Sequence, residues 1–136
     1  MALALDAEET RALLQEVPKA YRAQMEDALL SALCRALGAW TGRRHLLVDL
    51  EGHGRESEGP GGGLDLSRTV GWLTSQYPVL FAVESPWSAE EALCSVREQL
   101  RRVPRRGLGY GVLRYLGRGE LSRRLGEPPG AQVGFN

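Results

Sequence analysis

The residues of this 136-residue chain best suited to chemistry lie together in one short stretch, EGHGRE at residues 51–56. The apolar run His45–Leu50 comes directly before it, so Glu51 is predicted at the C-terminal end of a buried strand. α/β proteins place working residues at such strand ends, and a buried carboxylate there is a competent proton acceptor. Gly52 and Gly54 would let the backbone approach a ligand closely or adopt a positive φ.

The other side chains of the stretch leave two interpretations open. His53 is titratable, but between two glycines it is equally compatible with a packed or an exposed position. Arg55 and Glu56 are adjacent and could form a local ion pair, which would contribute little to stability. From the pattern alone, the stretch is either a functional site or a strand-end turn with a solvated cluster of charges.

Two helices and a strand are predicted on the N-terminal side of this stretch. A capping box at Asp6–Glu9 opens a helix that is expected to end near Glu16, before Pro18. A longer helix is expected from Lys19 to Trp40, with one apolar stripe facing the core. The stripe consists of Tyr21, Met25, Leu29, Leu33, Leu37 and Trp40. The strand that follows, His45–Leu50, is apolar on both faces, as in the centre of a covered sheet.

On the C-terminal side, residues 56–63 read as a surface loop rich in Glu, Gly, Pro and Ser. Extended segments are expected at residues 70–74 and 77–83, with a break around Ser75-Gln76. A second capping box, Ser88–Glu91, opens a helix. This helix is expected to end at Val103, before Pro104. A further helix is expected over Val112–Leu116. It is followed by a predicted turn over Gly126–Gly130 and the start of a strand at Ala131–Phe135.

The composition is that of an ordinary soluble domain. Seventeen basic and seventeen acidic residues cancel, which gives no overall electrostatic footprint for nucleic acid or for an anionic membrane. No apolar run reaches the roughly 18 residues of a membrane span. Residues 1–5 are too short and uncharged to be a signal peptide. A cytoplasmic location is therefore expected.

No metal or directly bound cofactor is predicted. Cys34 and Cys94 do not have the spacing of a metal motif and are expected to be small buried thiols. Gly61-Gly62-Gly63 lacks the Lys-Ser or Lys-Thr and the strand–loop–helix context of a phosphate-binding loop.

Five motifs in order along the chain resemble those of the epimerization domains of nonribosomal peptide synthetases, which belong to the condensation-domain superfamily. They are DALLSAL at 27–33, EGHGRE at 51–56, RTVGWLT at 68–74 with YP at 77–78, PRRGLGYG at 104–111, and GFN at 134–136. Leu73 stands where the family usually has Phe. Ordinary condensation domains more often carry a GFFVNTLPLR-like stretch where this chain has VGWLTSQYPV, so the epimerization branch fits better.

The resemblance implies a partial domain. The other hallmark of the family, an HHxxxDG motif in the N-terminal lobe, has no match, because His45 and His53 are the only histidines and no Asp-Gly follows either. Residues 1–136 are therefore expected to form the C-terminal lobe of a chloramphenicol-acetyltransferase-like fold, an α/β sandwich of two layers with a mixed sheet. The missing N-terminal lobe is an implied partner, and the isolated chain is expected to be inactive.

The resemblance also implies a mechanism. In the family, a carrier protein delivers an aminoacyl or peptidyl thioester on a phosphopantetheine arm, and the domain inverts the α-carbon. The second histidine of HHxxxDG and the glutamate opening EGHGRE are the acid/base pair proposed for the family. Only the glutamate carries over, as Glu51, and the neighbouring glycines would leave room for the substrate and its arm.

Five further residues match family positions and are predicted to bind substrate: His53, Arg55, Trp72, Tyr110 and Asn136. Arg55 would either hold the loop of Glu51 or pair with the pantetheine phosphate, and the local role is favoured. Trp72 is expected beside the active-site seam and Tyr110 under the floor of the tunnel, both more structural than catalytic. Two alternatives stay open for the chain: a fragment of an amide-forming condensation domain, or a non-catalytic module that docks a carrier. The amino acid acted on is not apparent.

Overall fold

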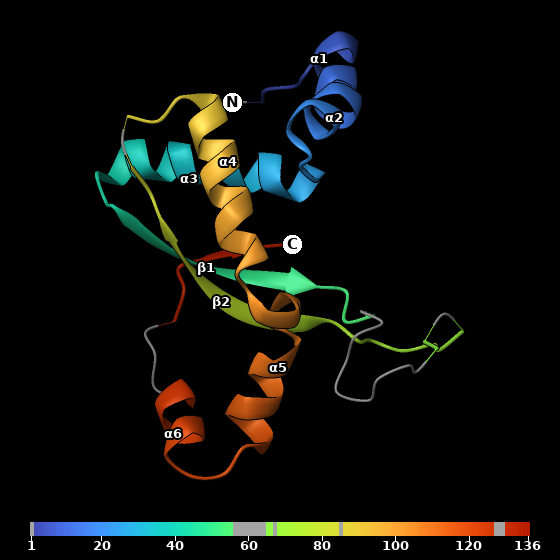
Figure 1. The fold of residues 1–136 in the computed structure, drawn as a ribbon, viewed down its shortest axis with the longest axis vertical. Coiled ribbons are helices and arrows are strands. Elements are labelled where there is room, and N and C mark those ends of the chain that lie inside the picture. Colours follow the sequence, from blue (N-terminus) through green and yellow to red (C-terminus); the bar gives the residue numbers. More distant parts are fainter. Residues whose placement is uncertain (1, 56–64, 67, 85, 127–129) are drawn as a thin grey trace. The chain divides into compact units, whose positions relative to one another are not determined.

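The computed structural model describes residues 2–55, 65–66, 68–84, 86–126 and 130–136. The chain has the predicted α/β fold, with helices and a mixed three-stranded sheet in the order β2-β1-β3 (Figure 1). The strands are β1 (His45–Gly52), β2 (Ser75–Ala82) and β3 (Val133–Phe135).

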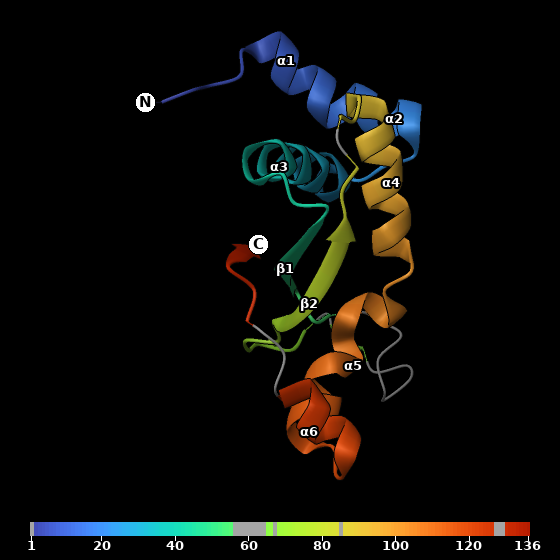
Figure 2. The same ribbon diagram turned by 90° about the vertical axis from the view of Figure 1, so that its left-hand side faces the viewer.

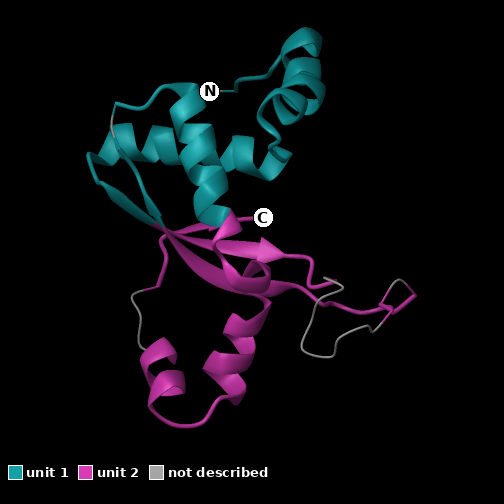
Figure 3. Ribbon diagram, viewed as in Figure 1, with its two compact units in different colours: residues 1–46, 81–100 teal, residues 47–80, 101–136 magenta. Residues whose placement is uncertain are grey.

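The chain forms two compact units (Figure 3). The first unit contains residues 1–46 and 81–100, and the second contains residues 47–80 and 101–136. Because β1 and β2 each cross a unit boundary, each strand contributes residues to both units.

The first unit begins with a helical stretch that contains Pro18. It runs through α1 (Ala7–Arg11), the π-helix η1 (Ala12–Glu16) and α2 (Val17–Tyr21). The predicted capping box is confirmed, since Glu9 N donates to Asp6 Oδ1 at 2.8 Å and Asp6 N donates to Glu9 Oε2 at 3.0 Å. The prediction that this helix ends before Pro18 is wrong. Pro18 lies in the first turn of α2, where a missing N–H costs little.

The predicted helix from Lys19 is interrupted, and this prediction too is wrong. Arg22 takes a left-handed conformation with φ 48° and ends α2. The longer helix, α3 (Met25–Thr41), then starts afresh. A capping box that was not predicted opens α3, with Gln24 N donating to Asp27 Oδ2 at 2.6 Å.

The buried face of α3 is not the predicted apolar stripe. Two members of that stripe, Leu29 and Trp40, are 44% and 83% exposed. The buried residues of α3 are Asp27, Leu30, Ser31, Cys34 and Gly38. Several of them are small, which lets the helix approach its neighbours closely. A Cβ added at Gly38 would lie 2.6 Å from Val83 Cγ1, so close packing outweighs the larger apolar stripe.

Helix α4 (Ala89–Arg101) follows its predicted capping box. Glu91 N donates to Ser88 Oγ at 3.1 Å, and Ser88 N donates to Glu91 Oε2 at 2.9 Å. α4 ends two residues before the predicted Val103. Figures 1 and 2 show that α3 and α4 lie next to each other within the first unit and that their axes cross. The buried apolar residues of the two helices are Leu30, Cys34, Ala92, Leu93 and Val96.

In the second unit, β1 pairs with β3 in parallel, with Val48 opposite Val133 and Leu50 opposite Phe135. The predicted strand at Ala131–Phe135 is therefore confirmed, and β1 is central in the sheet. The predicted break at Ser75-Gln76 is wrong, because β2 runs without interruption from Ser75. Residues 70–74 form no strand, and Val70 is fully exposed.

The rest of the second unit is helical. A 3-10 turn, η2 (Pro104–Gly107), leads into α5 (Leu108–Gly111), the π-helix η3 (Val112–Leu116) and α6 (Glu120–Gly126). The predicted helix over residues 112–116 is confirmed, and α6 was not predicted. Gly107 has a φ of +74°, and an added Cβ would lie 2.0 Å from the Tyr77 ring, so no other residue fits there. The predicted loop at 56–63 and residues 127–129 of the predicted turn lie outside the described residues.

Within the described ranges, no helix is long and apolar enough to cross a membrane. The same residues contain no group of three or more His, Cys, Asp or Glu placed to hold a metal ion. Cys34 is buried and Cys94 is half-buried, and both are free thiols. Burial raises the pKa of the Cys34 thiol to about 11.

Candidate active site

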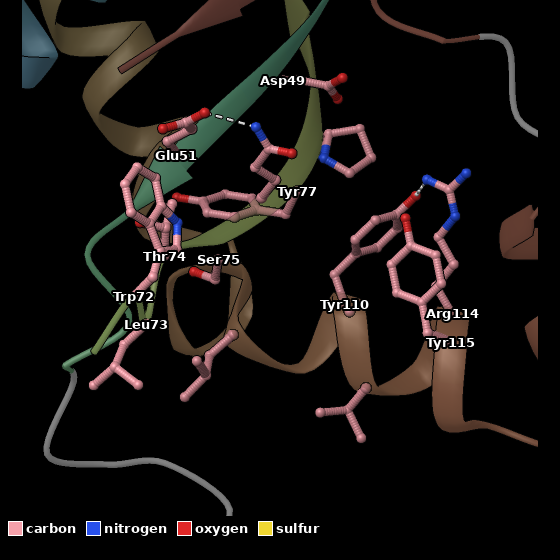
Figure 4. Close-up of a pocket in the computed structure, with 15 residues that line it drawn as sticks. Asp49, Glu51, Trp72, Leu73, Thr74, Ser75, Tyr77, Tyr110, Arg114 and Tyr115 are labelled. Carbon is pink, nitrogen blue, oxygen red and sulfur yellow. Dashed lines mark hydrogen bonds between the residues drawn. The ribbon is translucent and has the colours of Figure 1, made fainter. Parts of the chain in front are cut away.

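A cavity of about 560 Å³ lies within the second unit (Figure 4). Four segments line it: β1, residues 72–74 that lead into β2, β2 itself, and the helical stretch α5–η3. The lining residues are Asp49, Glu51, Trp72, Leu73, Thr74, Ser75, Gln76, Tyr77, Pro78, Leu108, Tyr110, Gly111, Val112, Arg114 and Tyr115.

Glu51 lies near the C-terminal end of β1, as predicted, and faces this cavity. It is half-buried, so its carboxylate is less enclosed than the sequence suggested. Gln76 Nε2, from β2, donates to Glu51 Oε1 at 2.6 Å. This hydrogen bond fixes one carboxylate oxygen, and within the described residues no hydrogen bond to the other oxygen is observed, so it can face a ligand. Asp49 lines the same cavity, because residues two apart on a strand share a face.

Arg55 organises the segment that carries Trp72. Its Nη1 donates to the carbonyl oxygens of Leu66 at 2.8 Å and Thr69 at 2.9 Å, and its Nη2 donates to that of Gly71 at 3.5 Å. The guanidinium thus holds the chain just before Trp72, whereas the local role favoured from the sequence was to hold the loop of Glu51. Arg55 does not line the cavity. The suggested ion pair with Glu56 lies outside the described residues.

The glycine at position 54 makes room for the protein's own backbone. Gly54 has a φ of +67°, and an added Cβ would lie 1.6 Å from the carbonyl oxygen of Leu73. The expectation that this glycine leaves space for substrate is therefore wrong. At Gly52 an added Cβ would come within 3.1 Å of Ser75 Oγ, so there too the neighbour is the chain itself.

The structure brings together three of the predicted site residues, Glu51, Trp72 and Tyr110. Trp72 is 88% exposed, and Tyr110 is half-buried on α5. The other three predicted residues do not line the cavity. His53 is exposed and its Nδ1 accepts from Arg55 N at 3.0 Å, and Asn136 is exposed just beyond β3.

Seven polar residues of the cavity were not among the predicted site residues: Asp49, Thr74, Ser75, Gln76, Tyr77, Arg114 and Tyr115. Arg114 Nη1 donates to Tyr110 Oη at 3.1 Å. Its guanidinium carbon lies 5.8 Å from the centre of the Tyr110 ring and 5.2 Å from that of Tyr115. Tyr110 and Arg114 are four residues apart, but the predicted helix began only at Val112, so the sequence did not indicate that they share a helix face. Nothing local indicated Gln76.

The cavity therefore has two chemically different ends. Figure 4 shows Glu51 and Trp72 on one side, and Tyr110, Arg114 and Tyr115 on the other. A carboxylate opposite a guanidinium-supported phenol can accept a proton at one point and stabilise developing negative charge at another.

Comparisons with known proteins show the family of the chain. The family model described as Condensation domain matches residues 1–124. One of the linear gramicidin synthase proteins of Brevibacillus parabrevis is 57% identical over 112 residues, which are 82% of this chain and 2% of that protein.

Two solved structures show the same fold. The epimerization domain from the third module of tyrocidine synthetase B has a TM-score of 0.83 and 35% identity, over 98% of this chain and 29% of that one. The first condensation domain of the calcium-dependent antibiotic synthetase, in complex with a substrate analogue, has a TM-score of 0.62 and 25% identity, over 97% of this chain and 26% of that one. The chain thus spans less than a third of each of these proteins. It belongs to the condensation-domain family, and its relatives are nonribosomal peptide synthetase subunits.

Proposed function

We propose that this chain forms one wall of an epimerization site in a peptide synthetase and that Glu51 is the base of that wall. The observation that carries the proposal is the carboxylate of Glu51, fixed by Gln76 at the edge of the cavity. The higher TM-score with an epimerization domain, 0.83 against 0.62 for a condensation domain, supports epimerization over amide formation.

The proposed substrate is an aminoacyl or peptidyl thioester on the phosphopantetheine arm of a carrier domain, in the cytoplasm. A thioester acidifies the neighbouring α-proton, and the carboxylate of Glu51 accepts that proton. The enolate so formed is planar, so a proton returned from the opposite face inverts the α-carbon. Trp72 and Tyr110 line the path of this substrate.

We propose that the acid on the opposite face is a histidine from outside these 136 residues. His45 and His53 are both exposed, and neither lines the cavity. We therefore propose that the chain works with an N-terminal lobe that carries the HHxxxDG motif, and that it is inactive alone. None of His53, Arg55 and Asn136 lines the cavity. We propose that these three residues contact the substrate arm outside the cavity.

A chimeric domain tests the proposal. This chain replaces the matching part of the tyrocidine synthetase B epimerization domain, and the chirality of a carrier-bound aminoacyl thioester is measured after quenching. Glu51→Gln keeps the shape of the side chain but removes its ability to accept a proton. The expected loss of epimerization is about 10²–10⁴-fold, the usual contribution of a general base.

The matched control is Glu120→Gln, the same change at an exposed position on α6. It should leave the rate unchanged, and both variants should melt like the parent domain. Near-normal formation of the D-product by the Glu51→Gln variant would rule out the base role. Epimerization by the isolated 136-residue chain would overturn the requirement for a second lobe.

A further inference from the structure

Tyr110, Arg114 and Tyr115 form a compact cluster at the end of the cavity away from Glu51 (Figure 4). Arg114 contacts both rings and donates a hydrogen bond to the Tyr110 hydroxyl at 3.1 Å. Helix α6 also holds the backbone of the cluster, because Ser122 Oγ donates a hydrogen bond to the carbonyl oxygen of Arg114 at 2.9 Å.

The helical segment that carries this cluster contains a π-helical turn. Regular helical spacing brings residues 110 and 114 onto one face, and the π-helix η3 spans Val112–Leu116. π-helical turns are rare and often occur at functional sites. The other such turn in the described part of the chain, η1, ends two residues before Pro18, which cannot donate into a regular helix. No proline lies within or just after η3, so its distortion has no such local cause.

The hydrogen bond determines how the Tyr110 hydroxyl can act. A guanidinium has only donors, so the phenol oxygen must be the acceptor of this bond. Within the described residues this is the one hydrogen bond of that hydroxyl, and its own hydrogen remains available to donate. Donation from a charged group polarises the O–H bond and strengthens it as a donor.

We propose that the Tyr110 hydroxyl donates a hydrogen bond to the thioester oxygen of the substrate as the enolate forms, and that Arg114 is the positioning residue for this hydroxyl. This inference rests on the epimerization function proposed above. When Glu51 takes the α-proton, the C–H electron pair becomes the carbon–carbon double bond of the enolate. The carbonyl π electrons move onto oxygen, where the hydrogen bond from Tyr110 stabilises them.

Tyr110 keeps its proton throughout this step. The proton that completes the inversion comes from a general acid of the imidazole class in the rest of the domain. Atoms and charges then balance, because Glu51 has gained one proton and that acid has lost one. The role of Tyr110 is therefore electrostatic, and its loss should lower kcat more than it raises KM.

The test uses the same chimeric domain and follows loss of α-deuterium from carrier-bound L-alanyl, L-leucyl and L-phenylalanyl thioesters. Tyr110→Phe removes only the hydroxyl and should lower kcat about 10²–10³-fold, as expected for a lost oxyanion donor. Tyr21→Phe is the matched control, because it removes a tyrosine hydroxyl from the first unit, at a residue that does not line the cavity. That control should exchange deuterium like the parent.

The test of Arg114 asks whether the effect of replacing it requires the hydroxyl of Tyr110. Arg114→Ala should lower kcat about 10–100-fold by misplacing the hydroxyl, and Arg114→Lys should recover part of the loss. If Arg114 acts through Tyr110, the double variant Tyr110→Phe/Arg114→Ala will be no slower than Tyr110→Phe alone. Melting curves of all variants serve as the folding control.

The outcomes separate the two proposals. An inactive parent chimera overturns the proposed function and this inference with it. An active parent in which Tyr110→Phe exchanges deuterium normally overturns the inference alone. Fully multiplicative losses in the double variant would instead show that Arg114 acts on the substrate directly, which also contradicts its positioning role.

Discussion

Of the thirteen buried apolar residues in the described part of the chain, nine belong to the first unit and four to the second, although both units also leave large apolar side chains exposed, such as Trp40 in the first. Phe81, Leu30 and Val96 of the first unit have no exposed surface. In the second unit, Trp72 is 88% exposed, Tyr115 72% and Leu116 77%. The second unit instead depends on specific backbone constraints, such as Gly54 against the Leu73 carbonyl and Arg55 holding three carbonyl oxygens.

This difference illustrates two ways in which a chain can be held in its folded conformation. Burial of apolar area stabilises the first unit without demanding exact geometry. A cavity that holds a substrate cannot be filled with apolar side chains, so its walls must be held by hydrogen bonds and by glycines at close contacts. Most stability should therefore reside in the first unit and most chemistry in the second.

The sharpest test compares two aromatic truncations. Phe81→Ala removes a fully buried ring from the first unit and should lower the free energy of unfolding by about 3–5 kcal/mol. Trp72→Ala removes an exposed ring from the second unit and should change it by less than about 0.5 kcal/mol. Urea denaturation of the 136-residue chain measures both. Equal losses would mean that the two units are stabilised alike.

A pair of glycines separates backbone strain from close packing. Gly42 and Gly54 have nearly the same φ, +66° and +67°, but only Gly54 has atoms within 4 Å of an added Cβ. Gly42→Ala in the first unit should cost about 1–2 kcal/mol from its left-handed conformation alone. Gly54→Ala should cost about 2–4 kcal/mol, because the Leu73 carbonyl must also move. Similar melting temperatures for the two variants would contradict the close approach at Gly54.

The contribution of Arg55 should be local. Arg55→Lys keeps the charge but cannot reach three carbonyl oxygens with one ammonium group. Amide hydrogen exchange should accelerate at residues 68–73, while the free energy of unfolding falls by about 1 kcal/mol or less. Unchanged exchange in that segment would show that Arg55 does not hold it.

The last prediction concerns Cys34 at alkaline pH. Because burial raises the pKa of the Cys34 thiol to about 11, the folded state favours the protonated form. This stabilisation is complete below the unfolded value of about 9 and is lost as the pH rises toward 11. The free energy of unfolding should therefore decline across pH 9–11, and a thiol reagent should modify half-buried Cys94 before Cys34. Faster labelling of Cys34 would contradict its burial.

Local signals in the sequence predicted much of the fold. The capping boxes at Asp6 and Ser88 are confirmed, because the residues that make them are three apart. The central strand ending near Glu51 is confirmed, since an apolar run of that length on both faces fits few other positions. The ordered family motifs identified the family correctly.

Predictions that depended on distant neighbours failed more often. The predicted buried face of α3 was wrong, because the small residues Ser31, Cys34 and Gly38 allow a closer approach than the larger stripe does.

The net charge of the whole chain did not indicate how charge is distributed along it. Residues 101–136 contain eight arginines and two glutamates, which the formal net charge of zero conceals.

The sequence by itself determined the family, the position of Glu51 at a strand end and the starts of two helices, because each depends on residues close together in the chain. Only the tertiary structure decided what faces Glu51. Gln76 reaches its carboxylate from β2, and the side chains of Tyr110 and Arg114 line the same cavity from α5 and η3. These neighbours are 25 or more residues away in sequence, and their approach follows from how the strands pair and where glycine lets backbones meet, which no local pattern records.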